Sequence, residues 1–133
     1  MKKIIIMIIL ISNFLYGASL TIKINNKNLL GKVHLFLYKG KQNFLKEQKA
    51  YKKINFKLTP NKTTLIIPKL SFGEYAYTVY LDENDNNKLD KNFMHIPKEP
   101  TGFSNNFKPK FKPKYDNFKF YLNNDLVQNI DLK

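Results

Sequence analysis

Short runs in which apolar and polar residues alternate recur along the chain from residue 20 to its end. Because successive side chains of a β-strand point to opposite faces, this period of two is typical of strands that bury one face. Gly, Pro and Asn between the runs predict turns. About seven short strands, with no long helical pattern, predict an all-β fold, an antiparallel β-sandwich. The runs lie at residues 20–24, 33–38, 54–58, 63–68, 75–82, 117–122 and 126–132.

The run that follows a turn at Gly73 gives the strongest strand signal. One face carries Tyr75, Tyr77, Val79 and Leu81, and the other carries Ala76, Thr78 and Tyr80. Aromatic and β-branched residues on both faces favour a central strand. Residues 40–51 are richer in Lys, Gln and Glu, and there Phe44 and Leu45 are expected to dock a short helical turn.

The first residues predict export. Two lysines precede an almost continuous apolar run at residues 4–15, and small residues follow at 17–19. A helix that spans a bilayer takes about twenty apolar residues, so this run is too short for one. We therefore predict a cleavable secretory signal at residues 1–18 and a single domain at residues 19–133. The expected product is a monomer in the periplasm or secreted, with no transmembrane segment once the signal is removed.

The composition excludes several classes of chemistry. The chain has no cysteine, which rules out disulfides, thiol catalysis and cysteine-ligated zinc. All 23 basic residues are lysine and the formal net charge is +13. Such a charge is typical of nucleic-acid binding, but specific contacts with bases depend on the bidentate fork of arginine. Because the chain lacks arginine and its signal leads out of the cytoplasm, we expect no nucleic-acid partner.

A polar segment directly follows the central strand, and it has oxygen-bearing side chains at alternate positions. The segment can be compared with a helix-flanked calcium loop, whose ligands lie at positions one, three, five, seven and nine. These positions are occupied here by Asp82, Asn84, Asn86, Lys88 and Asp90. At position seven the ligand is the main-chain carbonyl, so any residue is suitable there. Position six holds Asn87 in place of glycine, and position twelve holds Phe93 in place of the bidentate glutamate.

Two interpretations of this segment stay open. The oxygens bind Ca²⁺ weakly, at the millimolar level typical of extracellular modules. Alternatively, the segment is a turn rich in Asp and Asn whose side chains hydrogen-bond their own backbone without an ion.

A second polar segment lies farther along the chain. Its candidate binding residues are Glu99, Gly102, Phe103, Ser104, Asn105 and Asn106. Of these, Ser104, Asn105 and Asn106 are predicted either to bind a ligand or to hold the 82–90 loop by hydrogen bonds. Alternatively, the Asn residues only accept unusual backbone angles and cap turns.

No catalytic site is predicted. The two histidines, His34 and His95, lack the spacing of a zinc site. We expect His34 on a solvent-exposed face and His95 beside the turn at Pro97. A triad of Ser104, His95 and an aspartate can be drawn, but nothing supplies a nucleophile elbow or an oxyanion hole.

Lysine alternates with Phe, Pro and Tyr at residues 107–115. An extended chain would have one apolar edge and one edge with four positive charges. This edge either touches an anionic polymer or protects a strand edge from aggregation, while Phe111 and Tyr115 pack over the sandwich.

Three stretches together resemble the secreted bacterial family called domain of unknown function 2141. They are GEYAYTVYLDENDNNKLD at 73–90, IPKEPTGFSNN at 96–106 and KPKFKPKYDNFKFYL at 108–122. The resemblance implies an exported immunoglobulin-like or transthyretin-like sandwich and no established activity. Asn87 departs from the glycine usual in the family.

From these patterns we expect a non-catalytic β-sandwich module of the bacterial cell envelope. Its loops at 82–106 would bind an unknown envelope component, with Ca²⁺ as the one candidate cofactor. The alternatives are a carrier of a small ligand held among Tyr75, Tyr77 and Tyr80, or a hydrolase.

Overall fold

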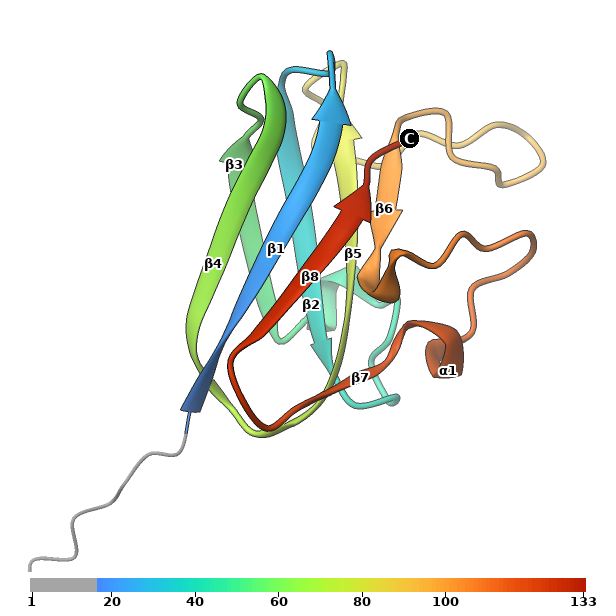
Figure 1. Ribbon diagram of the computed structural model, residues 1–133. Helices are drawn as coiled ribbons and strands as arrows, with labels where there is room; N and C mark the ends of the chain where they lie inside the picture. The colour runs from blue at the N-terminus through green and yellow to red at the C-terminus, as the bar shows by residue number, and fades with distance from the viewer. Residues whose placement is uncertain (1–16) are drawn as a thin grey trace, which may run out of the picture.

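The computed structural model describes residues 17–133, and the expected signal at 1–18 lies almost entirely outside that range. Two β-sheets pack face to face and irregular loops project beyond one edge (Figure 1). The first sheet has the order β4-β1-β8, and the second has the order β3-β2-β5-β6 with β7 also paired to β5. The all-β sandwich is confirmed. The strands are β1 (Gly17–Lys27), β2 (Lys32–Lys39), β3 (Lys52–Lys57), β4 (Asn61–Ser71), β5 (Gly73–Asp82), β6 (Thr101–Phe103), β7 (Phe120–Leu122) and β8 (Leu126–Asp131).

The alternation in the sequence becomes alternation in burial. In β1, every second residue from Ala18 to Asn26 is buried and the residues between them are exposed or half-buried. The buried set of β1 meets Leu35, Leu37 and Tyr77 from the second sheet in the main core. At about 25 cal/mol per Å² of apolar surface removed from water, this contact between sheets is the main source of stability.

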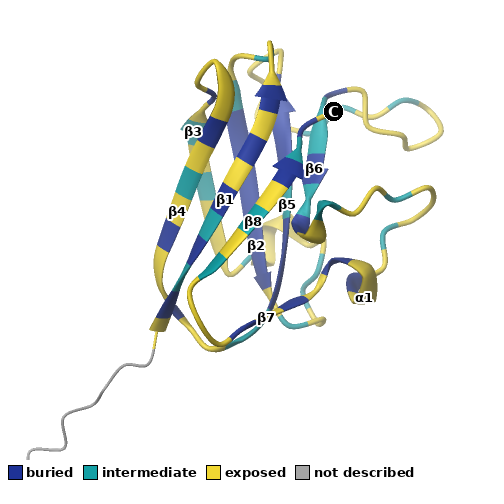
Figure 2. Cartoon of the chain, viewed as in Figure 1, coloured by how far each residue is buried: buried dark blue, intermediate teal, exposed yellow. Residues whose placement is uncertain are grey.

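β5 is a central strand, as predicted. It pairs with β2 along one edge, and its other edge is shared by β7 at residues 73–75 and β6 at residues 78–80. Both of its faces are buried, so it is dark along almost its whole length in Figure 2. Tyr75, Tyr77, Val79 and Leu81 face the core between the sheets, as the alternation predicts.

The outer face of the second sheet is covered by loops and by short helical turns. Two small apolar clusters form there, around Phe36, Tyr38 and Tyr80 and around Ala76 and Phe118. Three helical turns lie among the covering segments: η1 (Glu47–Lys49), η2 (Ser104–Asn106) and α1 (Tyr115–Phe118).

The predicted helical turn in residues 40–51 corresponds to η1. Phe44 docks against Tyr38, Tyr115 and Phe118, with ring centroids 5.4–5.6 Å apart. Leu45 does not dock, because it has a positive φ of 66° and is exposed.

One pair of strands departs from the expected antiparallel arrangement. β8 runs parallel to β1, with Leu20 opposite Leu126 and Asn25 opposite Asp131. The reason is that the chain leaves β7 in the second sheet and crosses to the first sheet within residues 123–125. It enters that sheet at the end where β1 also begins.

Within residues 17–133, no helix has the length and apolar character that a membrane span needs. The first strand begins at Gly17, two residues before the expected start of the domain.

Candidate functional site

The segment between β5 and β6 projects from the edge of the sandwich and contains four of the five predicted calcium ligands and Glu99 (Figure 1). We divide it into two parts. The root comprises residues 82–90 together with Glu99, and the tip comprises residues 91–98. The main-chain N–H of Lys98 donates to the carbonyl of Asp90 (2.8 Å), which closes the tip at its base.

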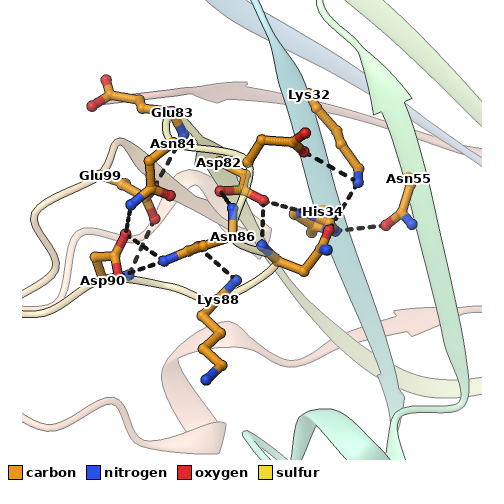
Figure 3. Close-up of polar contacts among 12 residues, drawn as sticks. Lys32, His34, Asn55, Asp82, Glu83, Asn84, Asn86, Lys88, Asp90 and Glu99 are labelled. Atoms are coloured by element: carbon orange, nitrogen blue, oxygen red, sulfur yellow. Dashed lines mark hydrogen bonds and ion pairs between the residues drawn. The ribbon is translucent and has the colours of Figure 1, made fainter.

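Asp82, the last residue of β5, fixes the start of the root. Its side chain is 0% exposed, and its two carboxylate oxygens accept hydrogen bonds from the N–H groups of Asn86 (3.2 Å) and Asn87 (2.8 Å). A third bond comes from His34 Nε2, 3.0 Å from Oδ2 (Figure 3). Burial alone would raise the pKa of Asp82, but these donors together hold the pKa below its usual value.

His34 is buried, and the prediction that it lies on a solvent-exposed face is wrong. Its side chain is 7% exposed; the ring stacks on Tyr80 at 4.9 Å between centroids and places Nδ1 2.7 Å from Asn55 Oδ1. The cause is the loop cover over the outer face of the second sheet, where Phe44, Ala50 and Leu89 pack against the outward-facing aromatic residues. Since an ionised carboxylate only accepts hydrogen bonds, Nε2 of His34 carries a proton toward Asp82.

Glu99 fixes the other end of the root. Its carboxylate is buried and accepts one hydrogen bond from the N–H of Glu83 and one from the N–H of Asp90, each at 3.1 Å. A single side chain thus holds both ends of residues 83–90. Glu99 was predicted to be a binding residue, and in the structure it anchors the backbone of the root.

Three of the five predicted calcium ligands come together in the root. The side-chain amides of Asn84 and Asn86 donate to the carboxylate of Asp90 at 2.7–3.1 Å. Asp82 faces a different set of partners, and Lys88 contributes its main-chain N–H to Asn86 Oδ1 (Figure 3). In this arrangement the root is closed by its own hydrogen bonds, as in the turn interpretation.

The contacts in the root show which of its side chains could bind calcium. Asp90 is a suitable oxygen ligand, and a rotation of the Asn84 and Asn86 amides would turn their oxygens toward an ion beside it. Asp82 is already committed to His34 and to two backbone groups. Among the described residues, no group of three or more His, Cys, Asp or Glu side chains is arranged to hold a metal. Calcium binding stays a prediction, with Asn84, Asn86 and Asp90 as its core.

The left-handed positions of the root agree with the sequence. Asn87, which replaces the glycine of position six, has φ of 59°, and Asp85 has φ of 55°. Asn and Asp are the residues after glycine that most readily adopt this conformation. Lys32 reaches across from β2 to both of them, with Nζ 2.8 Å from Asn87 Oδ1 and 3.7 Å from the Asp85 carboxylate.

The second polar segment holds the fold together. Ser104 is 0% exposed; its hydroxyl accepts from the N–H of Tyr77 (3.1 Å) and donates to the carbonyl of Phe118 (2.6 Å). Its oxygen is therefore committed to main-chain groups of β5 and α1. His95, the other member of the candidate triad, is exposed on the tip beside Pro97, where it was expected.

The neighbours of Ser104 link the second sheet to β8. Asn105 exchanges two hydrogen bonds with the side chain of Gln128, at 3.0 and 3.1 Å. Asn106 accepts from the N–H of Asp131 (2.9 Å), and its amide donates to the Asp131 carboxylate. That hydrogen bond outweighs burial and lowers the pKa of Asp131. A side chain at Gly102 would crowd β8 where it meets β6, because a Cβ would lie 3.1 Å from Ile130 and 3.2 Å from the Asp131 carbonyl.

The predicted tyrosine pocket does not form. Tyr75 and Tyr77 face the core between the sheets, whereas Tyr80 lies in the cluster on the outer face. The hydroxyls of the first two bond Ser71 O and Gln128 Oε1, both at 2.7 Å. The three tyrosines therefore share no cavity.

The features that the sequence analysis missed are Asn55 and Lys32, which support the root from β3 and β2. Two signals in the sequence pointed to a covered outer face: Phe36 and Tyr38 alternate in phase with His34, and Tyr80 lies on the outward face of β5.

A family model now decides what the chain is related to. The model described as "Uncharacterized protein conserved in bacteria (DUF2141)" matches residues 22–130. The chain belongs to this family. The match extends from within β1 to within β8, and so includes both sheets, the root, the tip and the second polar segment. No curated protein and no solved structure matches the chain.

Proposed function

We propose that this member of the DUF2141 family is an exported, non-catalytic binding module of the bacterial cell envelope, whose projecting segment at residues 83–98 is its recognition surface. One observation carries the proposal. Buried carboxylates fix the root, while the tip has three large apolar side chains in solvent: Phe93 (92% exposed), Met94 (63%) and Ile96 (53%).

A fixed shape matters because a binding surface that is already ordered loses less conformational entropy on association. Asn92 orders the tip: its side-chain oxygen accepts from the N–H groups of Met94 (2.9 Å) and Ile96 (3.0 Å). Its main-chain N–H donates to the carbonyl of Ile96 (2.9 Å). Large apolar side chains on an ordered, projecting turn contribute nothing to the core and are typical of interaction sites.

Export is supported by the first residues of the chain, where a basic start and a short apolar run fit a signal at 1–18. Fractionation of a bacterial host that expresses the full chain, with N-terminal sequencing of the product, tests this part. A product that keeps its first residues and stays in the cytoplasm contradicts export.

Recognition is tested by co-sedimentation with isolated envelope fractions: inner membranes, outer membranes and peptidoglycan sacculi. The test variant replaces residues 92–96 with a Gly-Ser segment of equal length and keeps Asp82 and Glu99. The control replaces Asn123 and Asn124, in the turn before β8, with Gly and Ser. We expect the wild type and the control to sediment with at least one fraction and the tip variant to stay in the supernatant. Sedimentation of the tip variant at wild-type levels contradicts the proposal.

A further inference from the structure

The tip has a partner in a second loop on the same side of the molecule. Residues 107–114, which we call the proline loop, project beyond β6 as the tip does (Figure 1). The loop is attached through Phe107, whose ring packs edge-on against Phe118 at 5.2 Å between centroids. Phe111, at its far end, is 89% exposed. The earlier expectation that Phe111 packs over the sandwich is wrong, whereas Tyr115 is buried as expected.

Within the tip and the proline loop themselves, every acidic or basic side chain apart from His95 is a lysine. The tip contains Lys91 and Lys98, the proline loop contains four lysines, and neither segment contains Asp or Glu. The six lysines are Lys91, Lys98, Lys108, Lys110, Lys112 and Lys114, and none of them is buried. Of these, Lys108 donates to the main-chain carbonyl of Asp131 (2.9 Å).

The acidic residues nearest to the tip are mostly occupied within the root. Asp82, Asp90 and Glu99 accept hydrogen bonds from root residues, and Asp85 pairs with Lys32. The tip and the proline loop are therefore apolar and basic, and the acidic side chains of the projecting segment belong to the root, where Glu83 and Asp85 are exposed.

We propose that the tip and the proline loop dock onto an anionic lipid bilayer, with Phe93, Met94, Ile96 and Phe111 entering the boundary between headgroups and acyl chains. The inference rests on the proposed function, since it names the envelope component. Lysines that flank inserted apolar side chains meet lipid phosphates at the headgroup level. A protein partner would need a cavity of its own for a convex tip, whereas a bilayer boundary accepts such side chains without a preformed pocket.

Vesicle sedimentation tests the proposal, with phosphatidylglycerol–phosphatidylethanolamine vesicles compared with phosphatidylcholine vesicles. The protein is used both as the full chain and as a chain that starts at Gly17. The shorter chain contains every strand and the whole core and lacks the apolar run at 4–15, which can itself enter lipid. We expect tighter binding to the anionic vesicles and loss of that preference in 1 M salt.

The apolar contribution is measured with the triple variant F93S, M94S, I96S, which should lower the partition coefficient by at least about tenfold. Ile66→Ser is the matched control, because Ile66 is 60% exposed on β4, in the first sheet. The basic contribution is measured with K110Q and K112Q together, which should cost about tenfold on anionic vesicles only. The control is K53Q with K57Q on β3.

Insertion is measured directly with a fluorescent reporter. The chain has no tryptophan, so Phe93→Trp places a single indole at the tip. Its emission should shift to the blue on anionic vesicles and be quenched by brominated acyl chains. The control variant Ile66→Trp should show neither effect. This reporter keeps the test decisive even where the triple variant folds poorly.

The outcomes separate the two proposals. Equal vesicle binding by the triple variant and the wild type, or an unshifted emission from the Phe93→Trp variant, overturns bilayer docking. Binding to sacculi, or to membranes only while their proteins are intact, without binding to pure lipid, also overturns it but leaves the envelope-binding function standing. No binding to any envelope fraction overturns both.

Discussion

The root and the tip belong to one projecting segment, yet their side chains are used in opposite ways. In the root, two buried carboxylates, those of Asp82 and Glu99, turn inward and accept hydrogen bonds from backbone N–H groups. In the tip, apolar groups turn outward, and Phe93 is almost fully exposed. Residue type alone would suggest the reverse, with the polar root as the binding site. The difference teaches that the buried carboxylates of the conspicuous acidic motif hold the backbone, and that the exposed apolar side chains of the segment lie beyond it.

The largest expected effect on the root comes from replacing Asp82. Replacing Asp82 with Ala leaves His34 and two backbone N–H groups without an acceptor in a buried site, so we expect a loss of about 3–5 kcal/mol in the free energy of unfolding. Asp85→Ala is the control, because its carboxylate is 79% exposed and its pair with Lys32 is worth less than about 1 kcal/mol. Urea denaturation measures both. Similar losses in the two variants would mean that Asp82 does not anchor the root.

The same carboxylate predicts a pH dependence. The folded-state pKa of Asp82 is lowered, so its ionised form contributes stability at every pH above the ordinary value of 3.8. That contribution is lost as the pH falls through the lower folded-state pKa. We expect the wild type to lose stability below pH 4 more steeply than Asp82→Asn, which has nothing to protonate there. The stability that the wild type loses at low pH should be smaller than the stability lost in Asp82→Ala, because the protonated carboxyl group still has oxygens that accept hydrogen bonds. The pKa of Asp131 is also lowered. Its effect on the pH dependence of stability is the same in the wild type and in Asp82→Asn, so it cancels when the two curves are subtracted. Parallel curves would contradict the prediction.

Glu99 tests the other end of the root. Glu99→Gln keeps one acceptor oxygen and replaces the other with an NH₂ group, which faces the N–H of either Glu83 or Asp90. One buried donor is left unpaired, at a cost of about 1–3 kcal/mol. Amide hydrogen exchange should show faster exchange at residues 83–90 and unchanged exchange in β1. Glu83→Gln, on an exposed side chain, serves as the control. Uniform loss of protection over the whole chain would show that Glu99 supports the global fold and not the loop.

The parts that the sequence predicted are those governed by local alternation. The period of two located the strands and placed Tyr75 and Tyr77 in the core, because burial of one strand face depends only on residue spacing. The parallel pairing of β8 with β1 depends on a crossover that joins residues about a hundred positions apart, and spacing carries no record of that. The bond between His34 and Asp82 links residues 48 positions apart on neighbouring strands and requires the sheet order.

The sequence also indicated the roles of some site residues and not of others. Three of the five candidate ligands, Asn84, Asn86 and Asp90, hydrogen-bond one another, whereas Asp82 and Lys88 bond other groups, and calcium binding stays a prediction. The role of Glu99 was missed because its partners are backbone N–H groups, which are the same for every residue type and leave no trace in sequence. The tip was overlooked because exposure of an apolar side chain is decided by what the fold leaves uncovered.

Calcium would distinguish the root from the tip, since it would bind the root and leave the tip unchanged. If Asn84, Asn86 and Asp90 bind the ion, calcium at ten times its dissociation constant raises the free energy of unfolding by about 1.4 kcal/mol. Thermal unfolding in about 10 mM CaCl₂ measures the shift, with MgCl₂ as the ionic-strength control. Asp90→Asn should abolish the shift, and Asp116→Asn, on α1, should keep it. The absence of a shift in the wild type, or an equal shift in Asp90→Asn, rejects calcium.

The smallest expected effect on stability comes from the tip. Its apolar side chains are exposed and its turn is held by Asn92, so the F93S, M94S, I96S variant should unfold within about 0.5 kcal/mol of the wild type. Asn92→Ala is the matched comparison: it leaves the N–H groups of Met94 and Ile96 without their acceptor, and exchange should quicken within 92–97. If the serine variant loses as much stability as Glu99→Gln, the tip packs against the body and belongs to the scaffold. If it keeps its stability, then Phe93, Met94 and Ile96 serve something other than folding, because the native state gains nothing from holding them in water.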